Sequence, residues 1–169
     1  MVENCCIIKS RLKGNYLSVK LQKGGKTMLN GEYFHQCDQK FRLRMPAKIK
    51  KEFSDGCFIT KGNDGCLFIF SAKQFEGLMA KLDSLPLFDS KAQRPLRMLL
   101  SSAFEVEEDA QGRFLLPASL RDFAGITKDV VFIGVGNRAE LWDKDKWAKY
   151  NESMASFDEC LSELGGYGI

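Results

Sequence analysis

The strongest constraint on the fold of this chain is an internal repeat with a spacing of 71 residues. Residues 33–47 align with residues 104–118, and the residue type is identical at four matching pairs of positions: Asp38 and Asp109, Arg42 and Arg113, Pro46 and Pro117, and Ala47 and Ala118. A solenoid needs at least three repeats to bury its core. The sequence therefore predicts a pseudo-symmetric pair of related units within one chain.

Each repeat predicts the same order of secondary-structure elements. An alternating strand leads into an Asp-x-x-x-Arg turn, and a second alternating strand follows it. A proline then stands where a short helix can begin, which gives expected helices over residues 46–53 and 117–123, the second ended by Gly125. The β-rich runs that come next are residues 57–60, 67–70, 130–133 and 140–142.

A longer helix is expected after each repeat. Ser71 and Gln74 form a capping-box pattern, which predicts a helix over residues 71–85, and Asp143 is placed to cap its counterpart. A further helix near residues 90–100 should link the two halves. Pro95 lies inside that segment and predicts a late start or a kink, because proline removes a backbone donor and clashes with the preceding turn.

Composition limits the classes of protein to which this chain can belong. Hydrophobic residues make up 44% of the 169 residues and charged residues 28%, as in ordinary globular proteins. No apolar run approaches the roughly 20 residues of a membrane helix, and no secretory signal is visible, so we expect a cytosolic protein without a membrane partner. The absence of a Gly-rich phosphate loop and of a nucleophile with an orienting base argues against an enzyme.

The cysteines and the single histidine predict no metal site and no other cofactor. The six cysteines contain no Cys-x-x-Cys pair, and His35 lies in an alternating stretch typical of a packed or edge strand. Free thiols in a reducing compartment are the expected state. A pairing of Cys57 with Cys66 across a hairpin is the alternative that the spacing leaves open.

Positive charge is concentrated in two segments. Residues 1–27 carry a net charge of +5 and the remainder −2, and residues 38–51 hold six basic residues and one acid. Lys40, Arg42 and Arg44 alternate, so on a strand they share one face. Such a face can neutralise phosphates, and arginine adds paired donors for phosphate or guanine. This pattern predicts contact with DNA.

The second repeat is a weaker candidate for that contact. Gln111 and Arg113 occupy the matching positions, but Glu105, Glu107, Glu108 and Asp109 come just before them. We therefore expect the first repeat to make most of the DNA contacts. Asp38 and Asp109 are expected to structure their turns by accepting backbone hydrogen bonds. A local ion pair within the turn is the alternative role for each arginine.

The region from Met28 to about Tyr150 resembles the bacterial MraZ family of the SpoVT-AbrB superfamily. The resemblance lies in residues 31–33, 38–42, 46–47, 64–69, 99–101, 109–113, 124–125, 135–136 and 141–144. It implies an α+β fold, mainly β, with tandem AbrB-like swapped-hairpin β-barrel units, flanking helices and a pseudo-two-fold internal repeat. The implied parts are a basic N-terminal extension (1–27), a first SpoVT-AbrB-like domain (32–74), linking helices (75–102), a second such domain (103–146), and a C-terminal helix and tail (147–169).

The resemblance also implies a function. It predicts sequence-specific binding of double-stranded DNA at repeated promoter elements of the division and cell-wall gene cluster, by ring-shaped homo-oligomers in the cytoplasm or nucleoid. It assigns DNA contact to Lys40 and Arg42 and, in the second signature, to Arg113 with Gln111 as its polar neighbour. The alternative is an oligomeric protein-interaction module that binds no DNA. Family members usually carry a small residue where this chain has Phe41, so a turn that needs a positive φ would strain it.

Overall fold

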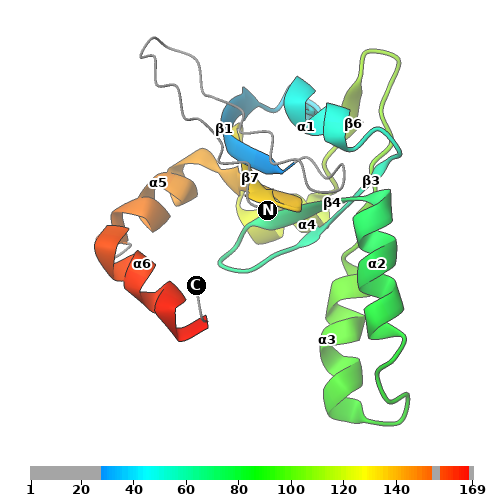
Figure 1. Cartoon of the computed structure of the whole chain (residues 1–169). Coiled ribbons are helices and arrows are strands. Elements are labelled where there is room, and N and C mark those ends of the chain that lie inside the picture. Colours follow the sequence, from blue (N-terminus) through cyan, green and yellow to red (C-terminus); the bar gives the residue numbers. More distant parts are fainter. Residues whose placement is uncertain (1–27, 154–156, 168–169) are drawn as a thin grey trace, which may run out of the picture.

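The computed structural model describes residues 28–153 and 157–167 (Figure 1). The basic extension 1–27 lies outside the described residues. The strands are β1 (Leu29–Gln36), β2 (Arg42–Arg44), β3 (Cys57–Lys61), β4 (Leu67–Ser71), β5 (Phe104–Glu105), β6 (Arg113–Leu115), β7 (Asp129–Gly136) and β8 (Arg138–Asp143). The helices are α1 (Ala47–Glu52), α2 (Ala72–Leu82), α3 (Ser90–Ser101), α4 (Ala118–Ala124), α5 (Lys144–Ser153), α6 (Phe157–Leu164) and the 3-10 turn Gly165–Tyr167.

The strands form an antiparallel sheet of six strands, in the order β1-β7-β8-β4-β3-β5, and a separate pair, β2 with β6. This bears out the expected α+β fold, and the structure adds that the large sheet is antiparallel. Strands of the two repeats are interleaved: β1 from the first repeat pairs with β7, and β5 from the second pairs with β3. At the centre, β4 and β8 run side by side with Leu67 opposite Leu141. Each half of the sheet therefore contains a strand from the other repeat.

The main core lies between the large sheet and the β2–β6 pair with its short helices. Leu43 in β2 is 1% exposed while Arg44 beside it is exposed, so the alternation of the sequence separates an apolar face from a cationic one. Leu43 pairs with Phe114 of β6, and Ile49 and Leu120 add the buried sides of α1 and α4. The core thus holds the cationic strand in place from behind.

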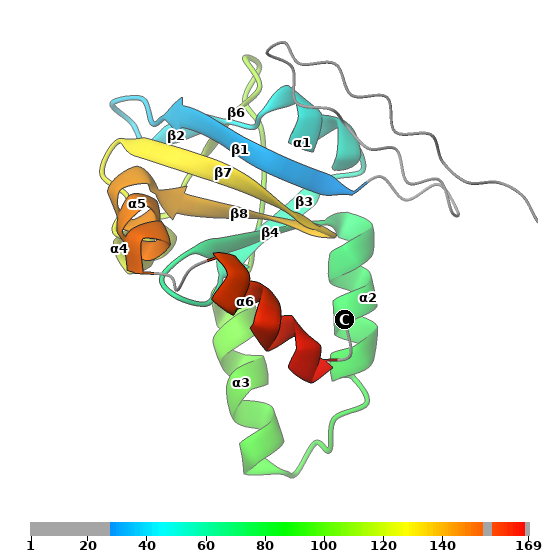
Figure 2. The same cartoon turned by 60° about the vertical axis from the view of Figure 1, so that its left-hand side comes forward.

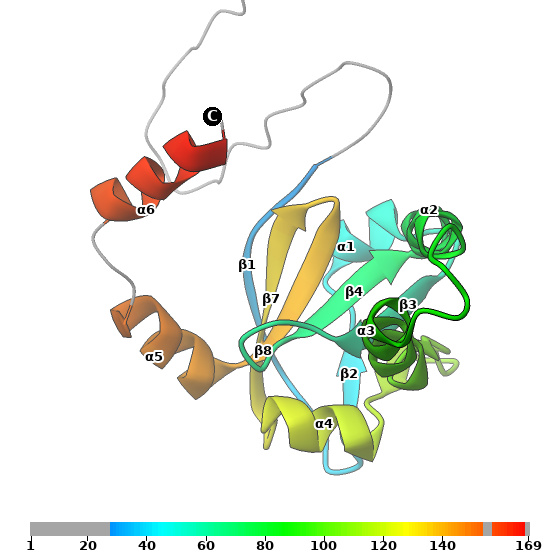
Figure 3. The same cartoon turned by 90° about the horizontal axis from the view of Figure 1, so that it is seen from below.

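Helices α5 and α2 lie against separate parts of the large sheet (Figures 2 and 3). Trp147 and Tyr150 of α5 pack against Trp142 of β8, with ring centroids 5.2 and 5.0 Å away. Phe75 of α2 stacks on Phe58 of β3 at 4.3 Å. The hairpin of α2 and α3 extends away from the sheet, and α6 follows α5 on another side of the molecule.

The helix predictions are largely confirmed, with shifts at the ends. In α2, the Gln74 amide donates to Ser71 Oγ and the Ser71 amide to Gln74 Oε1, which completes the capping box. The short helices begin one residue later than expected, because Pro46 and Pro117 keep extended ψ angles of 136° and 140°. Gly125 ends α4 with φ of 68°, the left-handed conformation that favours glycine.

The expected late start of the linking helix is wrong. Asp89 caps α3 by accepting from the amides of Lys91 and Ala92, so the helix begins at Ser90. Pro95 lies inside α3, where its ring nitrogen leaves one carbonyl without its intrahelical donor. The side-chain cap at the N-terminus fixes the start in spite of that loss.

The hairpin alternative for the cysteines is also wrong. Cys57 lies opposite Ser71 in the β3–β4 register, so it does not face Cys66. Cys37, Cys57 and Cys66 are buried free thiols, and burial raises their pKa to about 11, 12 and 12. Among the described residues no group of His, Cys, Asp and Glu is arranged to hold a metal ion, and no helix has the length and apolar character to span a membrane.

Candidate nucleic-acid interface

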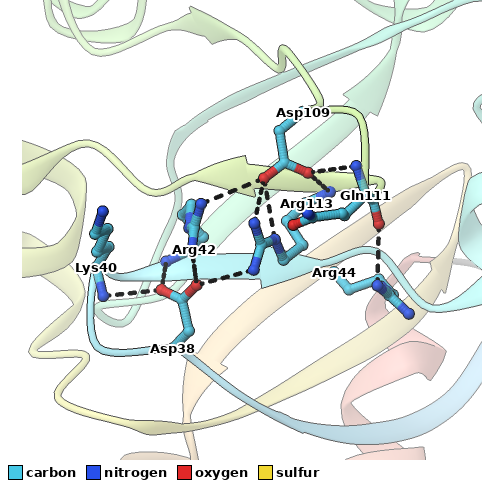
Figure 4. Close-up of polar contacts among 7 residues, drawn as sticks. All are labelled: Asp38, Lys40, Arg42, Arg44, Asp109, Gln111 and Arg113. Atoms are coloured by element: carbon cyan, nitrogen blue, oxygen red, sulfur yellow. Dashed lines mark hydrogen bonds and ion pairs between the residues drawn. The ribbon is translucent and has the colours of Figure 1, made fainter.

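The first Asp-x-x-x-Arg turn is organised by the carboxylate of Asp38 (Figure 4). Its Oδ1 accepts from the amides of Lys40 at 2.8 Å and Arg42 at 3.0 Å. The backbone closes the same turn, since the Asp38 amide donates to the Arg42 carbonyl at 3.0 Å and the Phe41 amide to the Asp38 carbonyl at 2.9 Å. Four hydrogen bonds therefore fix the loop between β1 and β2.

The second turn repeats this geometry. Asp109 Oδ1 accepts from the amides of Gln111 at 2.9 Å and Arg113 at 3.0 Å. The Asp109 amide donates to the Arg113 carbonyl at 2.7 Å, and the Gly112 amide donates to the Asp109 carbonyl at 2.8 Å. Matching residues 71 positions apart thus make matching bonds.

Both turns place their fourth residue in the left-handed region. The φ angles are 71° at Gly112 and 55° at Phe41. Glycine adopts this conformation freely, whereas a bulky side chain is strained in it. Phe41 keeps the turn unchanged because its ring is held from outside the loop: the Arg121 guanidinium lies over the ring, 3.9 Å from its centroid.

The two turns meet across the β2–β6 pair in a cluster of two arginines and two aspartates (Figure 4). Arg42 lies 2.7 Å from Asp38 in its own turn and 3.5 Å from Asp109 in the other. Arg113 lies 2.8 Å from Asp109 and 3.5 Å from Asp38. The arginine side chains are 28% and 26% exposed. We call these four residues the turn cluster.

The aspartates of the turn cluster stay ionised well below neutral pH. The backbone amide of Arg42, and then its guanidinium, lower the pKa of Asp38 to about 2. For Asp109 the guanidinium of Arg113 has the larger effect, followed by the Arg113 amide, and the pKa again falls to about 2. Since both arginines are charged, the turn cluster has no net charge at neutral pH.

The remaining cations lie around the turn cluster. The side chain of Lys40 is exposed and has no ion-pair partner in the described part of the chain. Arg44 is exposed and donates to the Gln111 carbonyl at 3.0 Å, which joins the first strand to the second turn. Lys48 donates to Asn30 at 2.7 Å, and Lys50 pairs with Glu108.

Seven residues singled out in the sequence therefore lie together: Asp38, Lys40, Arg42, Arg44, Asp109, Gln111 and Arg113. Sequence reasoning missed Arg121, which braces Phe41 from α4. The one available signal was the repeat, since Arg121 matches Lys50, and Lys50 approaches the second turn at Gly112 in the corresponding place.

This protein has a tandem-repeat α+β fold, and its two matching turns form one polar surface. These two features together define its class. The family described as "MraZ protein, putative antitoxin-like" matches residues 28–98 and again residues 99–163. The chain belongs to the MraZ family, as the resemblance of its motifs predicted.

Close relatives support the assignment. The transcriptional regulator MraZ of Clostridium beijerinckii is 44% identical over 142 residues, which cover 84% of this chain and 100% of the relative. That of Thermoanaerobacter pseudethanolicus is 45% identical over 143 residues, covering 84% and 100%. That of Heliobacterium modesticaldum is 44% identical over 138 residues, covering 81% and 96%.

Proposed function

We propose that this chain is a non-catalytic transcription regulator that binds double-stranded DNA sequence-specifically. The proposed targets are repeated promoter elements of the division and cell-wall gene cluster, and the proposed location is the cytoplasm, in association with the nucleoid. The names of its relatives support transcription regulation. The observation that carries the proposal for DNA is the turn cluster, which holds two turns of matching geometry as one unit with Lys40 and Arg44 exposed beside it.

The proposed DNA contacts fall into two groups, according to whether an aspartate neutralises the charge of the side chain. Lys40 and Arg44 carry charge that no carboxylate of the described chain neutralises, so they would bind phosphate oxygens, or guanine in the case of Arg44. Gln111 is exposed and offers an amide to a base edge. Arg42 and Arg113 share their charge with the aspartates, and they would add directed donors from a fixed position more than net attraction.

The fold supports a proposal in which the two repeats present their DNA contacts as a pair. The interleaving of β1 with β7 and of β5 with β3 supports swapped-hairpin units, and the equal hydrogen bonding of the two turns supports a pseudo-two-fold relation between them. The proposed domains are residues 32–74 and 103–146, joined by linking helices.

Assembly would multiply a weak contact. A few cations per subunit give modest and strongly salt-dependent affinity. In a ring-shaped homo-oligomer the same surface recurs at fixed intervals, so after one subunit binds, the next contact forms at high effective concentration. Evenly spaced promoter repeats would match such a ring.

The test is a binding titration with a promoter fragment that carries tandem short repeats, compared with a fragment whose repeats are scrambled, over a range of salt concentrations. We expect tighter binding to the intact repeats and a logarithmic affinity that falls linearly with the logarithm of salt. Equal binding to both fragments would refute sequence specificity, and the absence of salt-dependent binding would refute DNA as the partner.

A substitution locates the contact. Arg42→Ala should abolish specific binding without changing oligomer size, because it removes one of the two arginines whose directed donors the turn cluster holds in place. Lys73→Ala in α2 is the matched control, since it removes an exposed cation away from the turns. Full affinity of the Arg42→Ala variant would reject this role.

The alternative function is an oligomeric protein-interaction module without DNA binding. It is favoured by one observation: Leu87 and Phe88, between α2 and α3, are 72% and 96% exposed. Under this alternative the titration above shows no affinity that depends on salt, and a protein partner protects these side chains.

A further inference from the structure

Helix α3 presents a cationic face with an exposed methionine near its C-terminal end. The helix contains three basic residues and no acidic residue. Lys91, Arg94 and Met98 are spaced three and four residues apart, so they lie on one side of the helix. All three are exposed, and Met98 is 65% exposed. Leu87 and Phe88 are exposed as well, but they precede the N-terminus of α3 and lie at the other end of the helix from Met98.

Helix α6 has the opposite character. Its sequence holds three acidic residues and no basic residue. Leu161 and Leu164 are three residues apart and therefore neighbours on the helix surface, and they are 48% and 40% exposed. Asp158 is exposed on the same helix. Amphipathic helices of this kind normally bury their apolar side against another element.

The charges placed on these two helices are not neutralised by the ion pairs found among residues 28–153 and 157–167. The side chains of Lys91, Arg94, Arg97 and Asp158 take part in none of the ion pairs of that part of the chain. The α2–α3 hairpin and α6 extend from different sides of the sheet, as both the first view and the view from below show (Figures 1 and 3). A basic surface and an acidic surface on separate arms of one molecule can meet between two subunits.

We propose that α6 of one subunit docks on α3 of the next. The opposite charges of the two helices set the pairing, and burial of Leu161 and Leu164 against Met98 supplies the apolar contact. Two different surfaces meet in this contact, so it is heterologous, and repeated heterologous contacts close into a ring when the rotation permits. The inference rests on the proposed homo-oligomer and names the surfaces that build it.

The test uses two charge-reversed full-length chains and measures mass by light scattering after size exclusion. One chain carries K91E/R94E/R97E in α3, and the other carries D158K/E159K/E163K in α6. Each alone brings like charges together at every contact, so each should fall to the mass of a monomer at a concentration where the wild type is assembled. An equimolar mixture pairs acidic α3 with basic α6, and basic α3 with acidic α6, and should recover the wild-type mass or a neighbouring even-numbered ring.

Lys73→Glu in α2 is the control, because it reverses an exposed charge outside the two faces. It should keep the wild-type mass, and all variants should keep the wild-type circular dichroism spectrum, so that a fall in mass reports loss of assembly and not loss of the fold. The proposal is overturned by a wild type that is monomeric, by reversed chains that stay assembled, or by a mixture that remains monomeric. Repeat-specific DNA binding is measured separately on the wild type. A failure of DNA binding can therefore be told apart from a failure of the helix contact, which is measured by mass.

Discussion

At the scale of single residues, Phe41 shows how contacts of a side chain can compensate for a backbone conformation that favours glycine. The turn requires positive φ, which Gly112 meets freely and which costs a side-chain-bearing residue about 1 kcal/mol. Phe41 offsets that cost because its ring packs against the main core and under the Arg121 guanidinium. The sequence indicated the strain but not its compensation, because Arg121 reaches the ring from a helix 80 residues away.

Substitutions at this position should reverse the usual order of alanine and glycine. Phe41→Ala loses the ring and keeps the strained backbone, whereas Phe41→Gly loses the ring and relieves the strain. We expect both variants to be less stable than the wild type, and the glycine variant to be more stable than the alanine variant by about 1 kcal/mol. Urea unfolding monitored by circular dichroism measures this difference. An alanine variant as stable as the glycine variant would show that the turn does not depend on the left-handed conformation.

Because of the turn cluster, the free energy of unfolding should depend on pH in the acidic range. Asp38 and Asp109 have pKa values of about 2 in the folded chain, below the value near 4 of an unfolded aspartate. Groups with a lowered folded pKa stabilise the fold above the unfolded pKa, and this contribution is lost as pH falls from 4 towards 2. Stability measured by denaturant unfolding should therefore drop across that window.

The variant that isolates this effect is Asp109→Asn, which should lower stability at neutral pH and flatten the loss between pH 4 and 2. Glu107→Gln is its control, since Glu107 is exposed, lies two residues away and makes no ion pair within the described residues. An acid dependence of Asp109→Asn as steep as that of the wild type would place the titrating groups elsewhere.

At the scale of the elements, the sequence predicted most of the strands and helices but not which strands pair. Alternation placed Arg42 and Arg44 on one side of a strand and Leu43 on the other, as found. The sequence could not predict the contact of Arg42 with Asp109, because that contact depends on β2 pairing with β6 from the other repeat. Periodicity is a local property, whereas register between distant strands is set by the packing of the whole core.

The pairing of β1 with β7 depends on a glycine. Gly134 lies opposite Gly31, and a Cβ at position 134 would be 2.3 Å from the Asn30 amide nitrogen. Gly134→Ala forces the two backbones apart, so we expect a loss of about 1–3 kcal/mol, the usual cost of overpacking. Thermal and urea unfolding measure it.

Gly77→Ala is the opposite control for this prediction. Gly77 lies within α2, and apart from the adjacent helix backbone no atom comes within 4 Å of the added methyl group, so alanine should stabilise the chain by about 0.5–1 kcal/mol through helix propensity. A neutral Gly134→Ala would mean that β1 can move off β7 without cost.

At the scale of the whole molecule, the two repeats form one core. The family pattern matches the chain twice, yet the sheet joins β1 of the first repeat to β7 of the second, and β5 to β3 in return. The main core likewise contains Leu43 and Phe114 from the two sides of the β2–β6 pair. Each matched half of the sequence therefore takes strand partners and core residues from the other.

This interdependence gives a prediction for divided chains. A fragment of residues 28–101 keeps β1 and β2 but lacks β7 and β6, their pairing partners, and residues 102–169 have the converse deficit. Each fragment, as a monomer, exposes the apolar face of an unpaired strand and should show no cooperative unfolding. Expressed together, with a tag on one fragment only, they should co-purify and unfold in a single transition, because the strands regain their partners across the break. A monomeric fragment with a cooperative transition near that of the intact chain would show that one repeat is sufficient for a core, and that the interleaved strands add to a fold already formed.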